Sequence, residues 1–102
     1  MSRIEQLRKL VQMDPDDPLG HYGLALEHLN LEQWGDAAAS FASTIERDPN
    51  CAAAYYHKAR AEIAARSSDE AHATLTRGIE VAGAVGDEKT QREMRELLDT
   101  VV

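Results

Sequence analysis

Histidine and cysteine are the side chains of this sequence that could bind a metal or act in covalent catalysis. His21 and His28 stand seven residues apart, nearly two helical turns, which is too far for both to reach one metal without other ligands. His57 and His72 fall on different predicted helices, and no His-Glu pair has metalloenzyme spacing. Cys51 has no visible histidine partner, so we interpret it as a small structural residue in a linker. The sequence therefore predicts no enzyme, no metal and no cofactor.

Acidic residues are concentrated in one part of the chain. The formal net charge is -7, and the segment from Asp14 to Asp48 contains eight acidic residues against one arginine. Such a segment repels phosphate backbones, so we expect no nucleic-acid partner. Two interpretations stay open: these acids solvate the outer face and cap helices, or they steer a basic protein partner toward the surface.

Membrane and export signals are not expected in this chain. Residues 1–9 alternate charged and single apolar side chains, unlike a signal peptide, and no run is long and apolar enough to span a bilayer. We therefore expect a cytoplasmic protein with no membrane partner.

A 34-residue repeat organises the sequence. Pro15 and Pro49 lie 34 residues apart, each preceded by an aspartate. A period of this length in a helical chain is typical of stacked helical hairpins. Small residues recur 12 apart in both copies, where they would let two antiparallel helices approach closely. The matching positions are Leu7 and Leu10 with Phe41 and Thr44, and the small pairs are Ala25 with Ala37 and Ala59 with Ala71.

Capping signals and apolar spacing predict six helices and no strand. The expected helices are 2–13, 18–31, 35–47, 52–65, 68–82 and 88–100. The expected caps are the Ser2–Glu5 and Ser67–Glu70 capping boxes, Asp17 before Pro18, and Asn50 after Pro49.

Gly78 stands inside the predicted helix 68–82, where glycine costs about 1 kcal/mol of helix stability. We expect the last helix to pack over this position and compensate. Its apolar residues are Met94, Leu97 and Leu98.

The repeat resembles the tetratricopeptide repeat family. The matching residues are Leu24, Ala25, Trp34, Ala37, Phe41 and Pro49 in the first copy, and Tyr55, Ala59, Ala71 and Leu75 in the second. Glu32 and Arg66 replace the glycine that the family prefers between its two helices, so the turns are expected to differ. The resemblance implies an all-α fold of antiparallel helix-turn-helix repeats in a right-handed superhelix. Residues 1–102 would form one domain, with an N-terminal half-repeat (1–17), two repeats (18–51 and 52–85) and a capping helix (86–102).

The family resemblance also implies a function and a site. Members bind a peptide or helix of a partner protein in a concave groove lined by the first helix of each hairpin. Carried over by position, the groove residues would be Leu19, Tyr22, Gly23, Leu26, Leu29 and Asn30, then Ala53, Tyr56, His57, Arg60, Ile63 and Ala64.

One specialised family function is not expected here. Chaperone-binding members grip a terminal carboxylate with Lys, Asn and Arg, whereas Tyr22, Leu26 and His57 occupy the corresponding sites.

Two classes of function therefore remain open: an adaptor that binds a partner protein in the groove, and a structural subunit that self-associates or co-assembles through exposed hairpin ends. The first helix lacks the arm that would complete its hairpin. Its unpaired outer face is expected at Ile4 and Val11.

Overall fold

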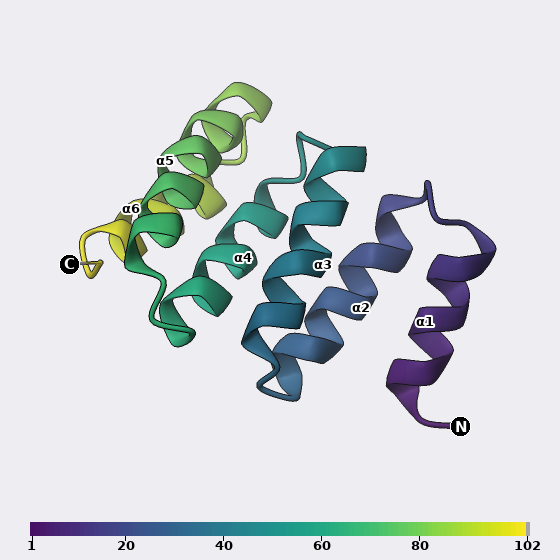
Figure 1. Ribbon diagram of the computed structural model, residues 1–102. Coiled ribbons are helices and arrows are strands. Elements are labelled where there is room, and N and C mark those ends of the chain that lie inside the picture. Colours follow the sequence, from purple (N-terminus) through teal and green to yellow (C-terminus); the bar gives the residue numbers. More distant parts are fainter. Residues whose placement is uncertain (102) are drawn as a thin grey trace.

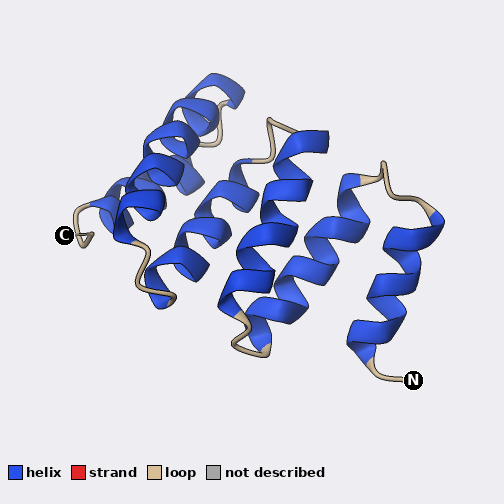
Figure 2. Cartoon of the chain, viewed as in Figure 1, coloured by secondary structure: helices blue, strands red, loops and turns tan. Residues whose placement is uncertain are grey.

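The computed structural model describes residues 1–101, which form six α-helices and no strand (Figures 1 and 2). Successive helices run in alternating directions and are joined by short turns. The helix bounds agree with the sequence prediction to within three residues. The helices are α1 (Arg3–Met13), α2 (Pro18–Asn30), α3 (Trp34–Arg47), α4 (Ala52–Ala64), α5 (Ser68–Val85) and α6 (Glu88–Leu98).

The helices form a curved array in which each packs mainly on its neighbours in sequence. Beyond these pairs, α2 touches α4 and α4 touches α6, whereas in residues 1–101 neither α1 and α3 nor α3 and α5 meet. Helices on the inner side of a curve lie closer together than those on the outer side, so α2, α4 and α6 line the concave side. The molecule measures 40 × 28 × 18 Å, and its two termini lie at opposite ends (Figure 1).

Small residues set the close approach of the two helices in each hairpin. Ala25 and Ala37 are fully buried between α2 and α3, and Ala59 and Ala71 are fully buried between α4 and α5. A methyl group at these positions allows interaxial distances near the low end of the ~8–10 Å range. Two apolar clusters surround them, one mainly from α2, α3 and α4 and one mainly from α4, α5 and α6, and Ile45 packs against both.

Each hairpin is tied to the loop before it by a polar side chain at the same repeat position. The Tyr55 hydroxyl donates to the carbonyl oxygen of Pro49 at 3.0 Å. His21, 34 residues earlier, places Nε2 2.8 Å from the carbonyl oxygen of Pro15. A carbonyl oxygen only accepts, so His21 Nε2 carries the proton. Histidine therefore makes the hydrogen bond that tyrosine makes in the next repeat.

The turns inside the two hairpins keep a backbone conformation suited to glycine, although neither contains one. Glu32 and Arg66 adopt φ values of 59° and 63°. This left-handed region costs a side chain about 1–2 kcal/mol relative to the right-handed one. Glu32 and Arg66 therefore hold, at a cost in strain, a backbone conformation that glycine adopts freely.

Two of the four expected helix caps are confirmed. Ser2 Oγ accepts from the Glu5 amide, and Asp17 Oδ1 accepts from the Leu19 amide. Ser67 is the N-cap residue of α5 but its hydroxyl makes no capping bond, because its backbone (φ -101°, ψ 66°) departs from the extended conformation that a cap requires.

The Asn50 prediction is wrong: α4 begins at Ala52, the expected start, and the residue before it, Cys51, is the N-cap residue. The Asn50 amide instead donates to Asp48 Oδ1 at 3.3 Å.

The outer face of α1 is rotated from its predicted position. Ile4 and Val11 are half-buried, and Val11 packs beside Gly20, which has no side chain to hold it off. Leu10 and Met13 are the apolar side chains of α1 that face solvent. The prediction that Ile4 and Val11 form the unpaired face is therefore wrong: both are half-buried, and Val11 packs on α2.

A charged pair replaces apolar packing between α4 and α5. Lys58 Nζ donates to Glu62 Oε2 at 3.1 Å and to Thr74 Oγ1 at 3.2 Å. The Glu62 side chain is only 4 % exposed, and its Oε1 has no hydrogen-bond partner. Its negative charge is therefore compensated almost entirely by Lys58.

Removing Lys58 should destabilise the fold more than removing the whole pair. We expect Lys58→Met to lower the free energy of unfolding by about 3 kcal/mol, because it leaves a buried carboxylate unpaired. Adding Glu62→Leu should restore most of that loss, since apolar packing commonly replaces a buried ion pair without penalty. Urea denaturation of both variants checks this. A double variant less stable than Lys58→Met would contradict it.

Gly78 is covered as the sequence predicts. A Cβ atom added there would lie 2.6 Å from Met94 Sδ of α6 and 2.6 Å from Tyr55 Cβ of α4. Both distances are far below normal contact. Because Gly78 has no side chain, α4 and α6 can both pack closely against α5 at this position.

We therefore expect Gly78→Ala to lower stability by about 1–3 kcal/mol through overpacking, despite the gain in helix propensity. Gly35→Ala is the matched control, because a Cβ atom at Gly35 would meet no atom within 4 Å. That variant should gain a few tenths of a kcal/mol. Thermal melts measure both, and a Gly78→Ala midpoint at or above that of the parent chain would refute the close contact.

Candidate partner-binding groove

The concave side contains a hollow between α2 and α4. Its volume is about 430 Å³. Its lining mixes apolar and polar side chains on the α2 side, and a guanidinium group enters from α4. The lining residues are Leu26, Leu29 and Asn30 of α2, Glu32 of the turn, Trp34 of α3, and Arg60 and Ala64 of α4.

A row of aromatic rings connects α2, α3 and α4 beside this hollow. His57 stacks on Phe41, with ring centroids 5.8 Å apart and planes 21° apart. Tyr22 meets both rings edge-on, at 5.9 Å from Phe41 and 6.3 Å from His57. Tyr56 also meets His57 edge-on, at 5.3 Å. The row fixes the relative positions of the two groove helices.

Arg60 is held in place by this aromatic row. Its guanidinium carbon lies 5.8 Å from the centroid of the Tyr56 ring, a cation–π distance. Its Nη1 lies 3.3 Å from His57 Nδ1. Because arginine only donates, His57 Nδ1 accepts, and the ring must be neutral for this contact. Arg60 itself is exposed to solvent.

The electrostatic surroundings of His57 favour its neutral form. Burial lowers the pKa of His57 below its ordinary value of 6.5, and the charge of Arg60 lowers it further, against an opposing effect from Glu93. Burial likewise raises the pKa of the Tyr22 hydroxyl. His57 and Tyr22 are therefore uncharged at neutral pH, and the positive charge next to the aromatic row belongs to Arg60.

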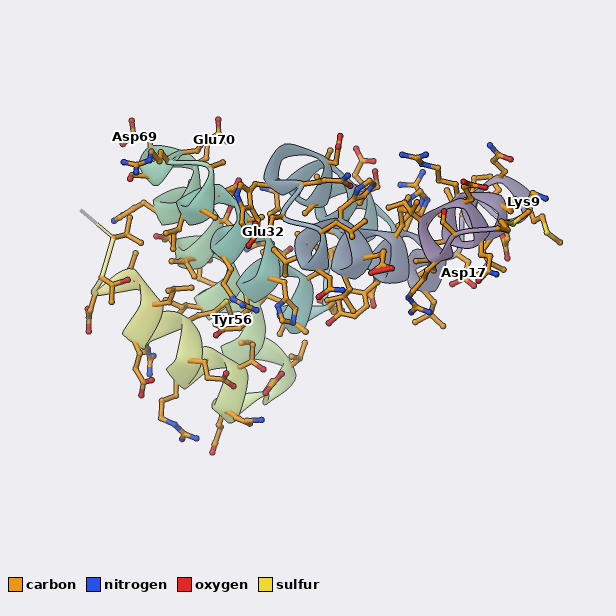
Figure 3. The ribbon with its side chains drawn as sticks, turned by 90° about the horizontal axis from the view of Figure 1, so that it is seen from below. Lys9, Asp17, Glu32, Tyr56, Asp69 and Glu70 are labelled. Atoms are coloured by element: carbon orange, nitrogen blue, oxygen red, sulfur yellow. The ribbon has the colours of Figure 1, made fainter. Side chains whose placement is uncertain are left out.

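A second, shallower hollow of about 300 Å³ lies between α4 and α6. Tyr56 forms its α4 side (Figure 3). The opposite side carries two carboxylates, so the groove changes from basic at Arg60 to acidic here. The lining from α6 and the following turn is Glu93, Glu96, Leu97 and Thr100.

The residues predicted for the groove fall into separate groups. Leu26, Asn30 and Arg60 line the larger hollow, and Tyr56 lines the smaller one. Tyr22 and His57 belong to the aromatic row. Ala53 and Ile63 are half-buried and line neither hollow. Leu19 is 74 % exposed and lies at the α1 end of the array, beside Leu10 and Met13.

Sequence reasoning missed the contributions of α6 and of the turn. Glu93 and Leu97 face Tyr56 because α6 touches α4 in the way that α4 touches α2. The only sequence signal for this contact is the spacing of apolar residues along α6. That spacing by itself indicates only a capping helix. The sequence predicts Glu32 in a turn and Trp34 in the packing within the hairpin. In the structure both also line the larger hollow.

The groups that could support metal or thiol chemistry do not gather in this groove. Among residues 1–101, no three His, Cys, Asp or Glu side chains are placed to hold a metal ion. Burial, followed by the charge of Asp48, raises the pKa of the Cys51 thiol, and a hydrogen bond from the Ala54 amide only partly offsets this. Within the same residues, no helix has the length and apolar character needed to cross a bilayer.

The depressed pKa of His57 predicts an acid-sensitive fold. Above about pH 6.5 both folded and unfolded chains have a neutral His57, so its stabilising effect is fully present. As the pH falls below that value, the unfolded chain binds a proton more readily than the folded chain, and stability is lost. We expect His57→Phe, which keeps the ring stack, to lose less stability between about pH 7.5 and 5.5 than the parent chain.

Urea denaturation across this pH range measures the effect. His72→Gln, a change at an exposed histidine of α5, controls for the loss of a histidine as such. Parallel pH profiles for the parent chain and His57→Phe would contradict the prediction.

Known proteins with this architecture were found by comparison of structures. The TPR2B domain of yeast Sti1, in a complex with pHsp70, is 27% identical and matches with a TM-score of 0.86, covering 93% of this chain and 76% of that chain. A tetratricopeptide repeat domain protein from Salinibacter ruber is 34% identical, with a TM-score of 0.77, covering 86% of this chain and 89% of that chain. A protein from Bordetella parapertussis shares the fold, with a TM-score of 0.84 at 18% identity, covering 99% of this chain and 88% of that chain.

Comparison of the sequence with family models gives the same assignment. No curated protein matches the chain significantly. The model described as tetratricopeptide repeat matches residues 22–84, which include α3, α4, most of α2 and nearly all of α5. Because that match covers more than half of the sequence and the helix hairpins follow the same period, the chain belongs to the tetratricopeptide repeat family.

Proposed function

We propose that this protein is an interaction module that binds a peptide or helix of a partner protein on its concave side, with the hollow between α2 and α4 as the main contact. The observation that carries the proposal is the pairing of three apolar side chains with one exposed, oriented guanidinium, in a lining that also contains Asn30 and Glu32. Leu26, Leu29 and Trp34 supply the apolar surface, and Arg60 supplies the charge. Binding sites commonly combine an apolar pocket with a few placed polar groups.

The chemistry of the hollow suggests what the partner segment contains. Arg60 Nη1 is directed to His57, and the rest of the guanidinium remains exposed for a partner. A carboxylate is the side-chain group that matches its remaining N–H donors. We therefore expect an acidic residue beside an apolar one, with the apolar side chain between Leu26 and Leu29. Holding Arg60 against Tyr56 reduces the entropy lost on binding.

The structural relatives support a protein partner in general terms. Two of the matching structures are TPR domains of yeast Sti1 in complexes with pHsp70 and pHSP90. In this chain Tyr22, Leu26 and His57 stand at the positions predicted for a carboxylate clamp. The clamp residues are replaced by an aromatic, an aliphatic and a neutral imidazole, so we propose a partner contact of a different kind, centred on Arg60.

Peptide selection tests this proposal and does not require the partner to be identified first. Short random peptides displayed on phage are selected on the chain, and the best one is synthesised and titrated by calorimetry. We expect acidic residues next to a large apolar residue, and we expect Arg60→Ala to weaken binding about tenfold or more, as loss of a central contact does.

Arg77→Ala is the matched control for that measurement. Arg77 is an exposed arginine on α5 that pairs with Glu80 at 3.4 Å, and it lines neither hollow of the groove. Its removal should leave the affinity unchanged. Equal affinities for the Arg60→Ala variant and the parent chain would move the binding surface away from this hollow.

A further inference from the structure

The smaller hollow, between α4 and α6, differs in chemistry from the one that carries the proposed function. Its volume is about 300 Å³, and its lining combines an aromatic ring and an aliphatic side chain with two carboxylates and a hydroxyl. The ring belongs to Tyr56, and α6 with the turn after it supplies Glu93, Glu96, Leu97 and Thr100. Glu93 and Leu97 are half-buried, whereas Glu96 and Thr100 are exposed. Glu93 is therefore partly shielded from solvent, and Glu96 is more open to it.

The chain itself does not neutralise the two carboxylates of this hollow. Within residues 1–101, Glu93 and Glu96 take part in no ion pair. The pairs formed there are Arg3–Glu27, Arg47–Glu46, Lys58–Glu62 and Arg77–Glu80. The three cations of α6 do not line the hollow; they are Lys89, Arg92 and Arg95. Two negative charges therefore face this space without a cation of the chain between them.

The negative hollow and the positive hollow lie close to the same histidine ring. Burial lowers the pKa of His57 most, the charge of Arg60 lowers it further, and the charge of Glu93 raises it. Tyr56 stands at the boundary, because its ring contacts His57 and also lies under the Arg60 guanidinium. A segment that crosses the concave side from α2 to α6 therefore meets a positive charge first and negative charges next.

A basic side chain matches the chemistry of the smaller hollow. A lysine ammonium carries three N–H donors, and the lining has three groups that bear oxygen, namely the two carboxylates and the Thr100 hydroxyl. That hydroxyl donates to the Leu97 carbonyl oxygen at 2.6 Å, so its own oxygen remains available to accept. Tyr56 and Leu97 provide apolar surface for the aliphatic stem of a lysine or arginine.

We propose that the smaller hollow receives a lysine or arginine side chain of the same partner segment whose acidic residue pairs with Arg60. This inference rests on the proposed function and adds Glu93 and Glu96 as residues that determine which segments bind. The two opposite charges also orient the segment, with its acidic residue over α2 and its basic residue over α6. The reversed placement would set like charges together.

The arrangement of the helices sets the spacing of these two residues. Because α2 touches α4 and α4 touches α6, the two hollows are about one interaxial distance apart, on the order of 8–10 Å. An extended chain covers that distance in about three residues. We therefore expect the acidic and basic residues of the bound segment to stand about three positions apart.

Peptide selection in parallel on three forms of the chain tests the proposal. These forms are the parent chain, the double variant Glu93→Gln/Glu96→Gln, and the control Glu5→Gln/Glu70→Gln. The control carries the same change of net charge at two exposed carboxylates that line neither hollow. We expect lysine or arginine about three positions from the acidic residue in peptides selected on the parent chain and the control. On Glu93→Gln/Glu96→Gln that basic residue should be lost while the acidic and apolar residues stay.

The outcomes separate this proposal from the one on which it rests. Peptides that keep the acidic and apolar residues but show no basic residue at a fixed spacing would overturn the present proposal alone. A basic residue that is selected equally on Glu93→Gln/Glu96→Gln would also overturn it. Selection that yields no acidic and apolar pattern at all would overturn the groove proposal, and this one with it.

Calorimetry of one selected peptide locates the contact without depending on a single protein variant. Replacing the basic residue of the peptide by methionine should weaken binding to the parent chain about three- to tenfold, the size of two exposed charge contacts. On Glu93→Gln/Glu96→Gln, with circular dichroism unchanged, the same replacement should cost less than about twofold, because the two changes remove one interaction. Equal losses on both proteins would place the basic residue elsewhere and refute the proposal.

Discussion

The close approach of two antiparallel helices is the constraint on which the rest of this structure depends. Ala25 against Ala37, and Ala59 against Ala71, bring each helix pair together at fully buried contacts. A hairpin packed so closely has little interior of its own, and its larger apolar groups lie on the sides. Those sides are buried only when the next helix covers them. Stacking, curvature and the concave side of the array all follow from this dependence.

The sequence was most informative where a residue type leaves a single structural choice. Alanine pairs 12 apart and proline 34 apart predicted the hairpins and their order, and Gly78 predicted a close contact with the last helix. Prediction failed at the end of α5, which runs past Gly83 to Val85. There Gln91 Nε2 donates to the Ile79 carbonyl and lies over Gly83, and Gly86 ends the helix with φ 77°. A tertiary contact decided that boundary.

The candidate site shows the same limit. The repeat position of Arg60 and Leu26 was enough to place them together on the concave side. It could not reveal that Leu19 lies beside α1, with Leu10 and Met13, or that α6 would bring Glu93 beside Tyr56. The sequence could not predict which face of α1 packs on α2 either, because Ile4 and Leu10 are both apolar. Which of the two is covered depends on the glycines that α2 presents to α1.

The two ends of the chain lie at opposite ends of a 40 Å array whose helices contact mainly their sequence neighbours. A pulling force applied between the termini would therefore load the helix contacts one after another, in series, rather than shear a single sheet or core. The contact between α1 and α2 would carry the same tension as every other contact. Mechanical extension should therefore proceed by peeling helices from an end.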